Sequence, residues 1–126
     1  MKYLVSIVLL LSTLLLSAPV PADDHERNQK AVLITGASTG IGRVTAEHLA
    51  AEGYFVYAGA RKDADIEALN KIDNIMAVRL DVTKQDNVDA AVKLIEDQGR
   101  GLWGLVNNAG VAVFAPFTEA KQADLE

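Results

Sequence analysis

The sequence predicts an α/β fold in which parallel strands form a doubly wound sheet with helices on both faces. Four short apolar segments alternate with stretches whose apolar residues recur at helical spacing. A glycine-rich turn, residues 35–42, connects the first apolar segment to the first helical stretch. Strands that alternate with helices form βαβ units, whose right-handed crossovers build a parallel sheet. We expect an incomplete sheet of about four strands with flanking helices.

The four apolar segments are the predicted strands. The first, residues 31–34, reads AVLI and is entirely apolar, as expected of a strand buried on both faces of a sheet. The other three are expected at residues 54–60, 75–80 and 102–106. We expect Trp103, in the fourth segment, to belong to the core rather than to contact a cofactor.

Helices are predicted between these strands and after the last one. The first follows the glycine-rich turn and runs to about Glu52, and the second spans residues 63–71. The third is capped by Thr83 and runs to about residue 98, and another is expected to begin at about Thr118. The apolar residues expected on inward faces are Ile41, Val44, Ala46 and Leu49 in the first helix and Val88, Ala91, Val92 and Ile95 in the third.

The amino-terminal segment, residues 1–22, is predicted to be a secretory signal peptide. A basic start precedes an apolar stretch, and small residues and prolines precede a candidate cleavage site after Ala22. An uncleaved membrane anchor through residues 3–20 is the alternative, although the prolines disfavour a spanning helix. Residues 23–30 are a polar linker, and residues 31–126 form the domain. We expect an exported protein (periplasmic, lumenal or secreted) or, in the alternative, a membrane-anchored one.

Composition limits the class of protein. The 126 residues predict one small domain, and 50% apolar with 23% charged residues is ordinary for a globular chain. The formal net charge of -5 argues against a broad basic surface for nucleic acid. The absence of Cys excludes disulfides and thiolate metal sites, and His48 has no neighbouring ligand set, so no metal site is predicted.

The glycine-rich turn, TGASTGIG, is the strongest functional signal. It lies between a predicted strand and a predicted helix, the setting in which such a turn binds a dinucleotide. Gly36 permits the tight turn, Gly40 lets the backbone approach a pyrophosphate, and Gly42 lets the helix pack close to the strand. The free N–H groups at the start of the helix favour the phosphates.

Two further motifs follow in order, LDVT at residues 80–83 and NNAG at residues 107–110. Together with the glycine turn they make residues 30–126 resemble the amino-terminal, cofactor-binding half of the short-chain dehydrogenase/reductase family. The resemblance implies a Rossmann-like sheet and a bound nicotinamide dinucleotide. It also implies that the NNAG asparagines brace the central sheet.

The resemblance implies a role for each matching residue. Gly36, Gly40, Ile41 and Gly42 would line the pyrophosphate. Asp81 would accept a hydrogen bond from the adenine amino group, with Val82 beside the ring. Asn107, Ala109 and Gly110 would border the adenine ribose. The residues alone leave simpler interpretations open, in which Asp81 caps a turn or helix and the asparagines form an ordinary turn.

The end of the second strand predicts the choice of cofactor. An acidic residue there commonly binds the ribose 2′-OH of NAD, but this chain has Ala60 followed by Arg61. Arginine forms charge-assisted hydrogen bonds with a 2′-phosphate, and Ser38 would add a hydroxyl contact. We therefore predict NADP, with NAD less favoured. The alternative is that Arg61 and Lys62 are simply a solvated basic pair.

The catalytic residues that the resemblance implies have no counterpart here. The family uses a Tyr with a Lys four residues later, together with a Ser and an Asn, and neither Tyr54 nor Tyr57 is followed by such a Lys. We expect the chain to end before the catalytic Ser, Tyr and Lys. It would then be the cofactor-binding portion of an oxidoreductase that transfers hydride between NADP(H) and a small-molecule carbonyl or alcohol, and be inactive alone. The alternative is a stand-alone dinucleotide-binding or regulatory module. A homo-oligomer is expected only of a full-length protein.

Overall fold

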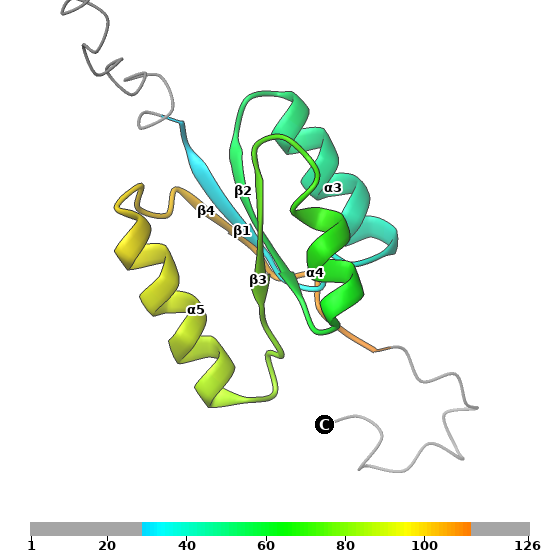
Figure 1. Cartoon of the computed structure of the whole chain (residues 1–126), viewed down its shortest axis with the longest axis vertical. Helices are drawn as coiled ribbons and strands as arrows, with labels where there is room; N and C mark the ends of the chain where they lie inside the picture. The colour runs from blue at the N-terminus through cyan, green and yellow to red at the C-terminus, as the bar shows by residue number, and fades with distance from the viewer. Residues whose placement is uncertain (1–28, 112–126) are drawn as a thin grey trace, which may run out of the picture.

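The computed structural model describes residues 29–111, which form one parallel sheet with helices on both faces (Figure 1). The sheet has the strand order β3-β2-β1-β4, and every neighbouring pair of strands is parallel. This order confirms the predicted doubly wound fold. The strands are β1 (Ala31–Ile34), β2 (Phe55–Ala60), β3 (Ile75–Arg79) and β4 (Gly104–Val106).

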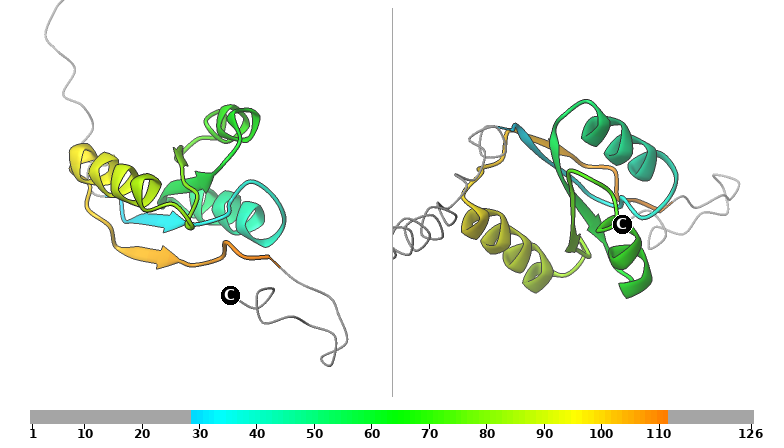
Figure 2. Two further views of the ribbon diagram at one scale, coloured as in Figure 1. Left: turned by 90° about the horizontal axis from the view of Figure 1, so that it is seen from below. Right: turned by 45° about the horizontal axis from the view of Figure 1, so that its top comes forward.

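Three helices connect the strands, and they cover the two faces unequally. The helices are α3 (Gly40–Ala51), α4 (Asp63–Leu69) and α5 (Gln85–Gln98). Helices α3 and α4 lie on one side of the sheet and α5 on the other, as two views show (Figures 1 and 2). The strand order explains this arrangement. The strands β1, β2 and β3 follow one another toward one edge of the sheet, whereas the connection from β3 returns past β1 to β4 at the other edge. Because crossovers are right-handed, reversing their direction places the helix on the opposite face.

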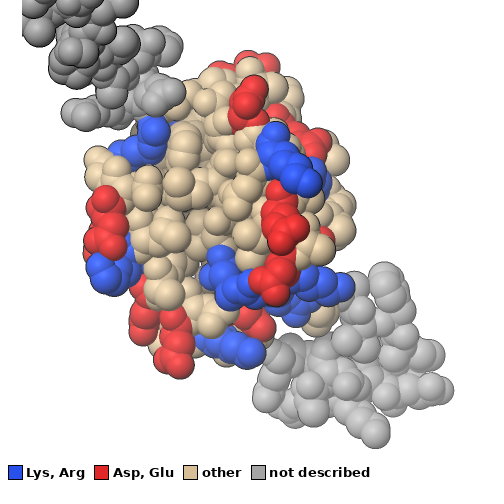
Figure 3. Space-filling model, viewed as in Figure 1, with Lys and Arg blue, Asp and Glu red and all other residues tan. Residues whose placement is uncertain are grey.

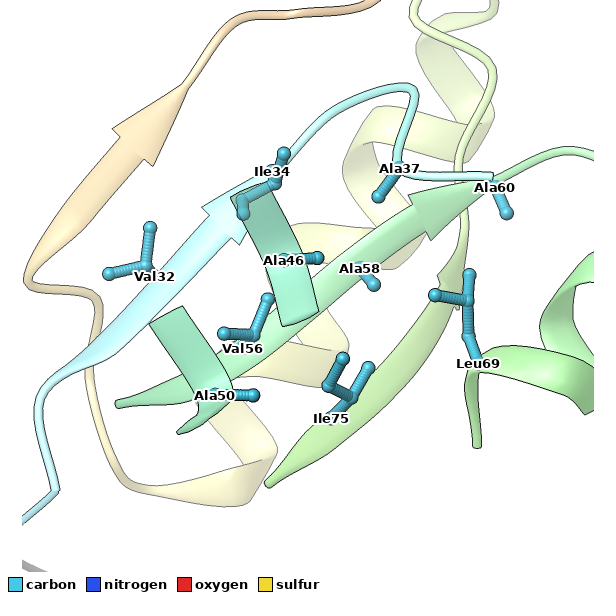
Figure 4. Packing of buried hydrophobic residues seen from close by; sticks show 10 residues of the cluster. All are labelled: Val32, Ile34, Ala37, Ala46, Ala50, Val56, Ala58, Ala60, Leu69 and Ile75. Carbon is cyan, nitrogen blue, oxygen red and sulfur yellow. The ribbon is translucent and has the colours of Figure 1, made fainter. Parts of the chain in front are cut away.

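Small residues of α3 pack closely against the sheet. Ala46 and Ala50 are buried against Val32 and Val56, which point from β1 and β2 toward the helix (Figure 4). Alanine side chains let the helix backbone approach the strands, and the apolar side chains of β1 and β2 fill the space between them. Each fully buried Val contributes about 1.5–3 kcal/mol relative to exposure.

The other face of the sheet packs against α5. Leu33 and Tyr57 alternate with the residues that face α3, and they meet Ala91 and Ile95 of α5. Tyr57 is fully buried, and its hydroxyl has no hydrogen-bond partner among the described residues. Burial raises the pKa of this hydroxyl above its usual value, while the positive charge of Arg100 partly lowers it.

The predicted inward face of the first helix was wrong at two positions. Ile41 is 80% exposed and Val44 is also exposed, whereas Ala46 is buried as predicted and Leu49 is partly buried against the same core. The fully buried residues of α3 are the small ones, Gly42, Ala46 and Ala50, and at Gly42 even a Cβ would collide with the Gly36 carbonyl and the Asn108 side chain. In α5, Ala91 and Ile95 are buried as predicted and Val88 packs partly, but Val92 is exposed.

Two local predictions also differ from the structure. Helix α5 begins at Gln85 with Lys84 as its amino-terminal cap, so Thr83 is not the cap. Trp103 precedes β4 and is 62% exposed, so its assignment to the core was wrong. Its backbone N–H donates to the Ala31 carbonyl (2.8 Å), which pairs it with the start of β1. Its ring lies on the surface beside Tyr54, with centroids 5.9 Å apart.

Some predictions fall on parts of the chain that the structure does not describe. The predicted signal peptide or anchor (residues 1–22), most of the linker and the helix expected from about Thr118 lie outside residues 29–111. Within the described residues, no helix is both long and apolar enough to span a membrane.

Candidate cofactor-binding site

The glycine-rich turn lies where β1 ends and α3 begins, against the NNAG segment. Gly36 adopts a φ of 64°, and a Cβ added to it would come 2.9 Å from the Cα of Ala109. A Cβ at Gly42 would collide with the carbonyl oxygen of Gly36 and with the side-chain nitrogen of Asn108. The turn and the NNAG segment therefore touch through backbone atoms, which only glycine allows at these positions.

Hydrogen bonds between Thr35 and Asn108 hold the two segments together. The buried Thr35 hydroxyl oxygen accepts from the backbone N–H of Asn108 (3.0 Å) and of Ala109 (2.9 Å). In return, the Asn108 side-chain amide donates to the carbonyls of Thr35 and Gly36, both at 3.1 Å. These bonds satisfy polar groups just beyond the end of the β1–β4 pairing, where no further ladder bond is available.

A cavity of about 340 Å³ opens beside this junction, at the carboxyl ends of the strands. Strand β1 lies between β2 and β4, so the connections from β1 and from β3 leave the sheet toward opposite faces at this point. Such a switch point is the usual ligand crevice of a doubly wound sheet. Seven of the predicted site residues line it: Gly36, Ser38, Arg61, Asp81, Val82, Ala109 and Gly110. The topology thus brings together residues from four separate loops.

Four predicted residues lie elsewhere. Ile41 projects into solvent from the first turn of α3, and Gly40 precedes it with open space around it. Gly42 lies beneath the turn rather than on the cavity wall. Asn107 lines a different, mostly apolar cavity of about 510 Å³ on the α5 side of the sheet. Their predicted contacts with a cofactor stay predictions.

Asp81 is held as an ionised acceptor at the cavity wall. Its Oδ1 accepts hydrogen bonds from the Thr83 hydroxyl (2.7 Å) and the Thr83 backbone N–H (3.1 Å). These hydrogen bonds lower the pKa of Asp81 from 3.8. Desolvation opposes them, and the positive charges of Lys84 and Arg61 make smaller contributions that lower the pKa further. The other oxygen, Oδ2, receives no hydrogen bond from residues 29–111 and is available to a ligand.

Acid titration tests this arrangement of Asp81. Because the folded-state pKa lies below 3.8, the carboxylate stabilises the folded chain above pH 3.8, and this contribution is lost as the pH falls through the lower folded value. An NMR titration of the Asp81 carboxyl should give a midpoint below 3.8. The Thr83→Val variant, which removes the hydroxyl donor, should raise the midpoint. A midpoint that stays the same in the variant would show that the hydroxyl bond does not hold the carboxylate.

Sequence reasoning missed two residues that organise the site. Thr35 belongs to the glycine motif, but its hydroxyl was assigned no role. Arg79 at the end of β3 was overlooked: its guanidinium donates to the Arg61 carbonyl (2.7 Å) and forms an ion pair with Asp63. A basic residue one position before the LDVT motif was the available signal. Within residues 29–111, no group of three His, Asp or Glu side chains is placed to hold a metal ion.

Comparison with known proteins decides the family. The family model for short chain dehydrogenases matches residues 30–126, which is more than half of the sequence. The chain belongs to the short chain dehydrogenase family. The glycine turn, the LDVT motif and the NNAG motif that predicted this relationship are the same segments that surround the 340 Å³ cavity.

Individual members of the family show how far the similarity extends. Bovine mitochondrial D-beta-hydroxybutyrate dehydrogenase is 43% identical over 95 residues, covering 68% of this chain and 28% of that protein. Mouse retinol dehydrogenase 7 is 43% identical over 90 residues, with the same coverage of 68% and 28%. The crystal structure of L-sorbose reductase from Gluconobacter frateurii, complexed with NADPH and L-sorbose, matches with a TM-score of 0.66 and 32% identity. That match covers 76% of this chain and 39% of the reductase, so the chain spans well under half the length of these relatives.

Proposed function

We propose that this chain is the NADP(H)-binding portion of an oxidoreductase that transfers hydride between NADP(H) and a carbonyl or alcohol substrate. The observation that carries the proposal is the cavity at the carboxyl ends of the strands, where the glycine turn, Asp81 and Arg61 meet. A bound dinucleotide would donate hydride to a carbonyl or accept it from an alcohol. The residues described here bind and orient it.

The glycine-rich turn and the start of α3 suit the phosphates of a dinucleotide. Gly36 lies on the cavity wall, and the start of α3 presents N–H groups that no residue of the helix can satisfy. We assign the pyrophosphate to this turn, the adenine amino group to the free oxygen of Asp81, and the adenine ribose to the segment at Ala109 and Gly110. Ionised Asp81 suits the adenine assignment, since a carboxylate is purely an acceptor.

The residues at the end of β2 favour NADP over NAD. Ala60 occupies the strand end at which an acidic residue would bind the 2′-OH of NAD, and Arg61 follows it on the cavity wall. Ser38 lies on the wall of the same cavity and offers a hydroxyl group. The NADPH complex of the related sorbose reductase is consistent with this assignment.

The Arg61→Ala variant tests the cofactor assignment. Loss of the charge-assisted bond to the 2′-phosphate should weaken NADPH binding by about 1.5–3 kcal/mol and leave NADH binding nearly unchanged. Isothermal titration calorimetry of the same preparations with both cofactors measures the two affinities. Lys62→Ala is the matched control, because Lys62 is the adjacent exposed cation and does not line the cavity. Unchanged NADPH affinity in Arg61→Ala would refute the assignment.

We also propose that this sequence binds cofactor without turning over substrate. The sequence contains no Tyr followed by Lys four residues later, and the hydroxyl of Tyr57 is buried in the α5 face of the sheet, away from the cavity. Oxidation of NADPH with a carbonyl substrate by the purified 126-residue chain would contradict this part of the proposal.

A further inference from the structure

Arg79 connects β3 to the segment that carries Arg61. The strand register places Arg79 opposite Ala60, the last residue of β2. One guanidinium nitrogen donates to the backbone carbonyl of Arg61 (2.7 Å), and another forms the ion pair with Asp63. The side chain thus holds residues on both sides of Lys62, and it restrains the turn from β2 into α4.

The ion pair matters because of where Asp63 lies. Its carboxylate is two residues beyond Arg61, and 84% of its side chain is exposed. Figure 3 shows basic and acidic atoms interleaved at this end of the domain, where β2 and β3 finish. Asp63 does not itself line the cavity, but an unpaired carboxylate two residues from Arg61 would still repel a 2′-phosphate. Pairing with Arg79 neutralises that charge.

The contribution of this ion pair to stability is expected to be small. Arg79 is 52% exposed, and ion pairs between exposed side chains add little to the free energy of unfolding. The backbone hydrogen bond to Arg61 is also close to the surface. We therefore expect loss of Arg79 to change cofactor affinity more than the free energy of unfolding.

We propose that Arg79 is a positioning residue that determines cofactor specificity, because it fixes the Arg61 backbone and neutralises Asp63 so that the loop accepts a 2′-phosphate. The inference rests on the proposed role of Arg61 in binding NADP(H). Arg79 itself does not line the cavity and acts through its neighbours.

The experiment compares NADPH and NADH affinities by isothermal titration calorimetry of the 126-residue chain and its variants. Arg79→Ala should weaken NADPH binding about tenfold, the effect of one charge-assisted contact, while NADH binding stays the same or improves. The double variant Arg79→Ala with Asp63→Asn should recover part of the NADPH affinity, because the uncompensated carboxylate is gone. Arg79→Lys keeps the positive charge but lacks the two guanidinium nitrogens that contact Arg61 and Asp63 separately. Its NADPH affinity should lie between those of the wild type and Arg79→Ala.

The outcomes separate this inference from the proposed function. Equal losses for NADPH and NADH in Arg79→Ala, or no recovery in the double variant, would overturn the role of Arg79 while leaving that of Arg61 intact. An unchanged NADPH to NADH ratio in Arg61→Ala would instead refute the parent proposal and this inference with it. If Arg79→Ala does not fold, Asp63→Asn alone decides: the inference requires that it keep or strengthen NADPH binding, and a loss of NADPH affinity contradicts it.

Discussion

Replacing Thr35 with valine should destabilise the folded chain by about 2–4 kcal/mol and abolish tight cofactor binding. Valine has nearly the same shape as threonine, so the change removes the hydroxyl and leaves the packing in place. Two backbone N–H groups, those of Asn108 and Ala109, then lose their acceptor. Because Thr35 is only 4% exposed, water has little access to replace its hydroxyl. Urea unfolding should show a lower midpoint with an unchanged slope.

The control for this prediction keeps the hydroxyl. Thr35→Ser retains the acceptor oxygen and removes only a methyl group, so it should cost about 1 kcal/mol, the transfer energy of one buried carbon. If the valine and serine variants lose the same stability, the hydroxyl bonds to the NNAG segment are not what holds the turn.

The Gly42→Ala substitution should have the second large effect, about 1–3 kcal/mol of destabilisation together with a clear loss of cofactor affinity. Alanine is the better helix former by about 1 kcal/mol, so propensity alone predicts the opposite sign. The structure reverses this expectation, because the added methyl group would collide with the Gly36 carbonyl and the Asn108 side chain. The carbonyl is backbone, so the turn itself has to move. Thermal unfolding and a titration with NADPH measure the two effects on the same samples.

A second glycine provides a matched control for the steric effect. Gly40 has a φ of 58°, and a Cβ there would meet nothing within 4 Å. In the thermal unfolding measurement, Gly40→Ala therefore reports the backbone strain of a left-handed residue, about 1–2 kcal/mol, without a steric collision. A Gly42→Ala variant at least as stable as the wild type would show that the contact between the turn and Asn108 adjusts without cost.

Both predictions concern one structural unit. The turn after β1 and the segment after β4 are joined by the Thr35 and Asn108 hydrogen bonds and by the close contact at Gly36. A change in either segment is therefore expected to alter stability and cofactor binding together. Variants at the outer edge of the cavity, such as Arg61→Ala, should instead change binding with little effect on stability, because this side chain is exposed.

The sequence predicted the strands and, through its three motifs, the family, because both are signalled locally. A run such as AVLI, apolar at every position, indicates a strand buried on both faces, and residues 31–34 form β1 as predicted. Gly36 was predicted to permit a tight turn and Gly42 to allow close packing of the helix; Gly36 has a φ of 64°, and a Cβ at Gly42 would collide with the Gly36 carbonyl. The alternation of strands with helices was sufficient to predict a doubly wound parallel sheet, since crossover handedness leaves few topologies.

Periodicity predicted only some of the residues that face the sheet: Ala46, Ala91 and Ile95 are buried as expected. Ile41 and Val44 have helical spacing and apolar side chains, yet they are exposed, and the buried positions of α3 are the small residues Gly42, Ala46 and Ala50. Trp103 has the character of a core residue, but its position just before β4 places it at the surface. The exposure of these side chains depends on how closely the helices and strands pack. The pattern of apolar residues along the sequence does not encode that distance.

By itself, the sequence determined the fold class, the family and the positions of the three motifs, since each depends on residues close together along the chain. Only the tertiary structure decided which distant residues act together. Thr35 and Asn108 are 73 positions apart, and they meet because the sheet places β1 beside β4. Arg79 reaches Arg61 and Asp63 because β3 lies beside β2 in a register that aligns their carboxyl ends. The physical reason is that strand pairing, not proximity in sequence, decides which side chains and backbone groups form hydrogen bonds at the carboxyl ends of a parallel sheet.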